Sequence, residues 1–128
     1  MSKLYLSLLS VALLCTSACS FIARDAEDYR KVTRELVESR GGDIKSCYDR
    51  ALETNESVSG TVLVNFTVEK KTGKVLNPKI DEAKTTAPAE ISQCIVQAID
   101  GLQLAEPDAR EGQATFSWEF KVGAPKSS

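Results

Sequence analysis

Hydrophobic and polar residues alternate over the stretch from residue 59 to residue 68, and the rest of the chain is organised around this pattern. One side of the alternation is apolar and consists of Val62, Val64, Phe66 and Val68. β-Branched and aromatic residues at a spacing of two predict a strand with one buried face. A turn over residues 69–74 follows, in which Gly73 fits the positive-φ position of a hairpin loop with a bulge. A second extended run over residues 75–80 completes a predicted β-hairpin.

A second alternation near the C-terminus predicts a third strand. Its apolar positions are Ala114, Phe116, Trp118, Phe120 and Val122, and its polar positions are Thr115, Ser117, Glu119 and Lys121. We interpret Trp118 as a core residue because it shares a face with Phe116 and Phe120. Pro78 lies inside the second strand, and proline cannot donate a ladder hydrogen bond, so this strand is expected at a sheet edge. We therefore predict an antiparallel sheet in the order 2-1-3, with the third strand at the other edge.

Three further segments show the spacing of amphipathic helices. The first covers residues 25–38, with an apolar stripe of Tyr29, Val32, Leu36 and Val37. The second follows the pair Gly41-Gly42, with Asp43 as its predicted N-cap. Its apolar face consists of Ile44, Cys47, Tyr48, Ala51 and Leu52.

The third helix is predicted to begin near Pro88, with Thr86 or Ala87 at its cap, and to end near Gly101. Its apolar stripe consists of Ile91, Cys94, Ile95, Ala98, Ile99 and Leu102. The chain is thus expected to form an α+β domain over residues 25–122, with helices packed on one face of a small three-stranded antiparallel sheet. Residues 123–128 are expected to be a polar tail.

The amino-acid composition excludes several classes of function, although it says little about the fold. The 128 residues include no histidine, which removes Ser-His and Cys-His nucleophile pairs and His-ligated metal sites. A net charge of −2 gives no basic face for nucleic acid. Neither the spaced oxygen ligands of a calcium loop nor a phosphate-binding glycine loop is present. We therefore expect no catalysis, no cofactor, no metal and no nucleic-acid partner, and no small-molecule substrate is evident.

Residues 1–18 are expected to be an export signal. Lys3 precedes an apolar run that is too short to span a membrane. Thr16-Ser17-Ala18 before Cys19 resemble the lipobox of bacterial lipoproteins, with threonine where leucine is usual. This resemblance implies cleavage after Ala18, lipidation of Cys19 and a tether over residues 19–24. The alternative is plain secretion, with Cys19 left as a thiol.

Cys47 and Cys94 are the thiols that remain after Cys15 leaves with the signal and Cys19 is acylated. Both lie in the middle of an apolar helical face, and two such thiols in an oxidising compartment favour a disulfide over two buried free cysteines. A structural bridge is favoured over a redox pair because neither cysteine lies in a Cys-x-x-Cys motif. Lys45 and Arg50 are the nearest basic residues in sequence to either cysteine.

Several strings together resemble a known family. They are residues 44–52, 59–62, 66–68, 73–75 and 91–95. They are similar to the AgmX/PglI C-terminal domain, a TonB C-terminal-like module of deltaproteobacterial envelope proteins, over about residues 27–122. The resemblance implies a TonB C-terminal-like fold and a role in envelope or motility-associated systems, similar to transducers that add a partner's extended segment to an open sheet edge. The chain departs from those transducers in its lack of a long Pro-rich spacer and a membrane-spanning anchor.

The third strand is the candidate partner site. Its outward residues Thr115, Ser117, Glu119 and Lys121 lie beside an edge whose N–H and C=O groups could accept another strand. The alternative is that Glu119 and Lys121 are charges that protect the edge from pairing. Tyr48 and Arg50 form a second candidate surface pair, although a tyrosine on an apolar stripe is more typical of the core with its hydroxyl at the rim.

These observations predict a lipid-anchored periplasmic protein-binding or scaffold module of the bacterial envelope, associated with motility or transport machinery. Its expected contacts are an envelope protein, through strand addition, and the membrane, through the lipid. Ser20 stands where an aspartate would favour retention in the inner membrane, so the outer membrane is favoured. A disulfide-dependent redox or enzymatic accessory domain and a purely structural envelope lipoprotein are the alternatives.

Overall fold

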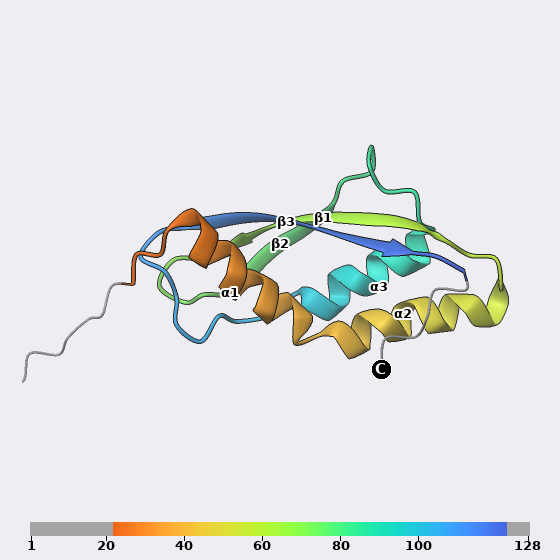
Figure 1. Cartoon of the computed structure of the whole chain (residues 1–128), viewed down its shortest axis with the longest axis horizontal. Helices are drawn as coiled ribbons and strands as arrows, with labels where there is room; N and C mark the ends of the chain where they lie inside the picture. The colour runs from red at the N-terminus through yellow and green to blue at the C-terminus, as the bar shows by residue number, and fades with distance from the viewer. Residues whose placement is uncertain (1–21, 123–128) are drawn as a thin grey trace, which may run out of the picture.

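The computed structural model describes residues 22–122 and shows an α+β fold (Figure 1). Its elements are α1 (Ala26–Glu38), α2 (Gly41–Thr54), β1 (Gly60–Val68), β2 (Val75–Ile80), α3 (Ala89–Ile99) and β3 (Gly112–Phe120). The three strands form an antiparallel sheet in the order β2-β1-β3, and the three helices lie on one face of it. The predicted fold class, element order and strand order are confirmed.

The β1–β2 hairpin follows the alternation in the sequence. Val62 and Val64 are fully buried, and Gly73 has the expected positive φ of 71° in the turn. The bulge lies in β2 and not in the loop, because Asn65 pairs with Lys79 whereas Thr67 pairs with Leu76. At this bulge, Asn77 and Pro78 together stand opposite the single residue Phe66, and Asn77 has a φ of 53°. Asparagine tolerates this left-handed conformation better than most residues.

The helix termini differ from the predictions at two caps. Asp25 caps α1 as an acceptor from the backbone N–H of Asp28 at 2.8 Å, but Asp43 is not the N-cap of α2. That helix begins at Gly41 and its N-cap is Arg40, whose side chain makes no capping hydrogen bond. The glycine pair thus forms the first turn of α2, and the break between α1 and α2 lies just before it, at residues 39–40. At α3 the N-cap is Pro88 itself, later than Thr86 or Ala87.

The main core lies between β1 and α3, and α2 packs against α3. Ile91, Ile95 and Ile99 of α3 have no exposed surface. A disulfide between Cys47 and Cys94 joins α2 to α3, with the two Cα atoms 5.7 Å apart. The predicted bridge is therefore confirmed.

The prediction for Val122 is wrong. β3 ends at Phe120, and the side chain of Val122 is 56% exposed, because the chain leaves the sheet before this residue reaches the helical layer. Within residues 22–122, no helix is long and apolar enough to cross a membrane. The predicted signal, Cys19 and the whole of the predicted polar tail lie outside the described residues.

Candidate functional site: a groove beside the free edge of β3

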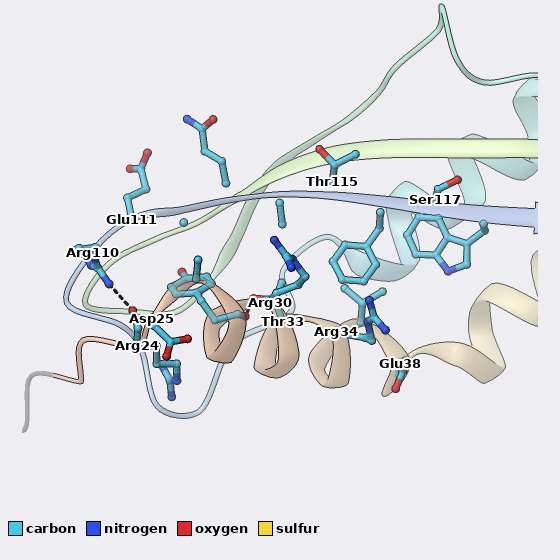
Figure 2. Close-up of a pocket in the computed structure, with 18 of the residues that line it drawn as sticks. Arg24, Asp25, Arg30, Thr33, Arg34, Glu38, Arg110, Glu111, Thr115 and Ser117 are labelled. Carbon is cyan, nitrogen blue, oxygen red and sulfur yellow. Dashed lines mark hydrogen bonds between the residues drawn. The ribbon is translucent and has the colours of Figure 1, made fainter.

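An open groove of about 1000 Å³ runs between α1 and β3 (Figure 2). We call it the α1–β3 groove. Its apolar lining includes Val37 of α1, Ile44 of α2, and Ala114, Phe116 and Trp118 of β3. Val37 and Ile44 are buried, whereas the three β3 residues are only partly buried. The groove thus has an apolar floor that is open to solvent along β3.

The inward face of β3 is less covered than the inward face of β1. Every inward residue of β3 is intermediate in burial, whereas four inward residues of β1 are buried. Trp118 illustrates the difference, since it packs against the core cluster and also lines the groove. The prediction that Trp118 is a core residue is therefore only half right. Its ring follows Phe116 along the groove, with the ring centroids 6.0 Å apart.

The direction of the main-chain groups of β3 can be deduced from β1. The Thr61 carbonyl accepts from the Thr86 N–H at 2.8 Å, and the Leu63 carbonyl accepts from the Asp81 N–H at 2.9 Å. Both residues thus direct their main-chain groups toward the β2 side of the sheet. Because this direction alternates along a strand, the residue between them, Val62, must bond to β3.

The same alternation applies to β3 through the pairing register. Val62 pairs with Trp118 and Val64 pairs with Phe116, so these β3 residues direct their main-chain groups toward β1. The β3 residues whose N–H and C=O groups face outward are therefore Gln113, Thr115, Ser117 and Glu119. Because β3 is at the sheet edge, these groups have no strand beside them within the described residues. The predicted edge site thus coincides with the outward main-chain groups at Thr115, Ser117 and Glu119.

On the outer face of β3, the side chains are charged at the C-terminal end of the edge and uncharged at its centre. Lys121 lies beyond the end of β3, where its Nζ is 3.2 Å from the Glu119 carboxylate and both side chains are exposed. Thr115 donates a hydrogen bond of 2.6 Å to the Asn65 side chain of β1. Within β3 itself, the charge that could protect the edge thus lies at the C-terminal end. The centre of the edge, around Thr115 and Ser117, carries no charge.

Two arginines of α1 also line the groove. Arg30 and Arg34 are four residues apart, so they lie on one side of the helix, and both are exposed. Figure 2 shows them beside the groove, below β3. Sequence reasoning missed this pair, because a basic pair on a helix normally indicates a solvated surface. Its meaning depends on the placement of α1 beside β3, which the sequence pattern does not provide.

Asp108 fixes the N-terminal end of the described chain. Its side chain is fully buried and accepts hydrogen bonds from the backbone N–H groups of Arg24 at 2.8 Å and Arg110 at 3.0 Å. Burial by itself raises the pKa of Asp108, but these N–H groups and the two guanidinium groups hold the pKa below its usual value. The Ile22 carbonyl accepts from the Ala109 N–H at 2.8 Å. Residues 22–24 of the predicted tether are therefore part of the folded domain.

Tyr29 and Gly112 bring α1 and β3 together near this end of the groove. A Cβ on Gly112 would overlap the ring and the hydroxyl group of Tyr29, so only glycine fits there. The Tyr29 hydroxyl is buried and has no hydrogen-bond partner among the described residues. Burial, followed by the negative charge of Asp108, raises the pKa of this hydroxyl. The guanidinium of Arg110, which donates to the Arg24 carbonyl, lies at the same end (Figure 2).

The other predicted candidates lie elsewhere. The Tyr48 hydroxyl donates to the Val58 carbonyl at 2.8 Å, and its ring stacks on Phe120, in agreement with a tyrosine at the rim of the core. Arg50 instead contacts the disulfide, with its Nη2 atom 3.2 Å from Cys94 Sγ, at a shallow hollow of about 260 Å³. Tyr48 and Arg50 therefore make separate contacts and do not form the predicted recognition pair.

Comparisons with protein-family models, with curated proteins and with solved structures find no match for this chain. The resemblance to the AgmX/PglI C-terminal domain therefore stays a prediction. Among residues 22–122, no group of three or more cysteine, aspartate or glutamate side chains is placed to hold a metal ion. The α1–β3 groove and the edge beside it are the features from which a function can be argued.

Proposed function

We propose that this protein is a lipid-anchored, periplasm-facing binding module of the bacterial envelope that captures an extended segment of a partner protein as an added strand on β3. The observation that carries the proposal is the coincidence of two features. β3 has outward main-chain groups at Thr115 and Ser117, and its inward side chains Phe116 and Trp118 are half covered in the adjoining groove. An edge strand by itself is common. An edge with an apolar groove beside it offers hydrogen-bonding groups for a partner's main chain and a surface for its side chains.

The two features match the two components of binding by strand addition. Main-chain hydrogen bonds to Thr115 and Ser117 would provide affinity, and pockets for alternate side chains would provide specificity. Every second side chain of the added strand would point toward α1, into the space between α1 and the rings of Phe116 and Trp118. Burial of these rings stabilises the complex by about 25 cal/mol per Å² of apolar surface removed from water.

The anchor fits the same proposal. Arg24 is fixed by Asp108, and the five residue steps from Cys19 to Arg24 span at most about 18 Å. A lipid on Cys19 would thus hold the Tyr29 end of the groove close to a membrane surface. The intact mass of the protein from its native membrane tests this part. A chain that begins at Cys19 and carries acyl groups supports it, and an unlipidated chain contradicts it.

The edge is tested with a proline at Ser117. The Ser117 N–H points away from the sheet, so S117P removes an edge donor without removing a hydrogen bond of the β1–β3 ladder. The matched control S117A removes the side chain and keeps the N–H. We expect the wild type and S117A to protect the amides of Thr115, Ser117 and Glu119 from hydrogen exchange when a partner from envelope extract is bound, whereas S117P fails to retain the partner. A folded S117P that retains it contradicts strand addition.

The contact between Arg50 and Cys94 favours a redox role as the second candidate. A guanidinium group near a sulfur stabilises the thiolate that is released when a disulfide is reduced, and Cys94 is only partly buried. Titration with glutathione and thioredoxin redox buffers separates the two roles. A bridge that opens near the potential of the glutathione pool supports redox activity, whereas one that stays oxidised below about −300 mV supports a structural role.

A further inference from the structure

The α1–β3 groove is lined by charges of both signs, and its cations are concentrated along the middle of α1. Asp25 and Glu111 lie at the Tyr29 end of the groove, and Glu38 lies at the C-terminal end of α1. Arg30 and Arg34 line it, and neither has a carboxylate of any described residue within 4.0 Å. The other two arginines of the lining, Arg24 and Arg110, are both held by the buried Asp108. The middle of the groove therefore presents two exposed guanidinium groups that make no ion pair with any described residue.

The placement of these two groups relates them to an added strand. Thr33 and Val37 are buried on the same helix and line the groove between and beyond the two arginines. On the β3 side, the groove is lined by Phe116 and Trp118. A strand paired with β3 would direct alternate side chains into this space. Such a side chain would meet aromatic surface on one wall and guanidinium groups on the other.

We infer that the segment captured at the β3 edge is acidic, an inference that rests on the proposed strand addition. The segment is an extended peptide whose groove-facing positions carry apolar side chains together with at least one aspartate or glutamate. The apolar side chains pack on Phe116 and Trp118, and the carboxylate binds the guanidinium groups of Arg30 and Arg34. Arginine suits this role because its planar fork of donors binds a carboxylate through two parallel hydrogen bonds.

A second copy of this chain does not meet this requirement. In a pairing of β3 with another β3, the groove-facing residues of the incoming strand would be Gly112, Ala114, Phe116, Trp118 and Phe120. None of these side chains carries a negative charge, so Arg30 and Arg34 would stay unneutralised. The acidic residues of β3 lie on its outer face. The charge of the groove thus points to a foreign segment and not to self-association.

The test is a selection of peptides by the full-length protein, purified with its disulfide oxidised. A display library of random peptides of about ten residues, the length of a long strand, is passed over four immobilised baits. They are the wild type, the charge reversal R30E/R34E, a control reversal K31E/K70E and the edge variant S117P. Lys31 and Lys70 are exposed and lie outside the groove lining, so the control changes the net charge equally.

We expect the wild type and K31E/K70E to enrich peptides with Asp or Glu at alternate positions among apolar residues. R30E/R34E should enrich Lys or Arg at those positions, and a selected Glu peptide should bind it at least about tenfold more weakly than it binds the wild type. Synthetic peptides with Glu replaced by Gln give the same comparison by fluorescence anisotropy. Affinity for the Glu peptide should also fall as salt rises above about 0.15 M.

The remaining outcomes separate the two proposals. Peptides selected without charge preference, and lost on S117P, overturn the acidic segment and leave strand addition intact. Acidic peptides that bind S117P as well as they bind the wild type overturn strand addition. No selected peptide from the wild type, or a concentration-dependent dimer that S117P abolishes, overturns the foreign acidic segment.

Discussion

The two halves of this molecule cover the inward face of the same sheet to different extents. On the side of α2 and α3, the sheet is sealed by isoleucines with no exposed surface, and the helices are joined by the Cys47–Cys94 disulfide. On the side of α1, the inward face of β3 stays half covered beside an open groove. The first half provides the stability of the domain. The second half can therefore keep apolar surface exposed for binding without loss of the fold.

The largest expected effect concerns the sealed half. In the double variant C47A/C94A the disulfide closure of a separation of 47 residues is lost, which costs about 4 kcal/mol of unfolding free energy in the loop-entropy model. Urea unfolding of the wild type and the variant measures this difference. Because neither cysteine lines the groove, peptide binding by the fraction that stays folded should not change.

The control for this prediction is reduction of the wild type, which should give a similar loss of stability. A loss of much less than about 2 kcal/mol would mean that helix packing holds α2 on α3 without the bridge. In that case the disulfide would not be what distinguishes the half with α2 and α3 from the half with the open groove.

The second prediction compares one side chain from each half. Ile95 has no exposed surface, so I95A should destabilise the fold by about 3 to 4 kcal/mol through lost burial and a cavity. Phe116 is half covered, so F116A should cost only about 1 to 2 kcal/mol despite the larger side chain removed. Chemical denaturation gives both values. F116A should in turn weaken peptide binding, which I95A leaves intact in its folded fraction. Equal destabilisation by the two variants would show that β3 is sealed as well as α3.

The contrast between the halves also explains what could be predicted from sequence. Alternation over β1 and β3, the helical stripes, and Pro78 in β2 were sufficient for the elements and the strand order, because each is a local property of the chain. The disulfide followed from two cysteines on apolar faces. The groove did not follow, since an alternating strand has the same pattern whether its inward face is covered or not. The interpretation of Trp118 as core was only half right for that reason.

The structure changes the interpretation of one helix start and of two sets of charged residues. Asp43 resembles an N-cap, but α2 begins two residues earlier, at Gly41, so Asp43 lies in the first turn of the helix. Arg30 and Arg34 look like a solvated helical surface until α1 is placed beside β3. Asp108 looks like a loop acid, and its burial depends on residues more than eighty positions away. Long-range placement, and not residue type, decided these roles.

The third prediction concerns the contact that sets the width of the groove. In G112A the added Cβ would overlap the Tyr29 ring, which should cost about 1 to 3 kcal/mol as overpacking, with a shift of α1 away from β3. Removal of the ring in the double variant Y29A/G112A should recover much of the loss caused by G112A relative to Y29A. A double-mutant cycle of unfolding free energies measures this coupling. Additive effects would show that α1 and β3 are not held in contact here.

The smallest expected effect is a dependence of stability on pH at the Asp108 end of the groove. The pKa of Asp108 is lower in the folded protein than its ordinary value of 3.8, so the unfolded state binds more protons in acid. The stabilisation is therefore complete above the unfolded pKa, and it is lost as pH falls from about 4 through the folded pKa. D108N keeps the shape and removes this titration, so its unfolding free energy should be lower at neutral pH and flatter below pH 4. Unfolding curves between about pH 7 and pH 2 measure both slopes. Equal slopes for D108N and the wild type would mean that Asp108 does not hold Arg24 and Arg110 as a charged group, and the fixed start of the chain beside the groove would need another cause.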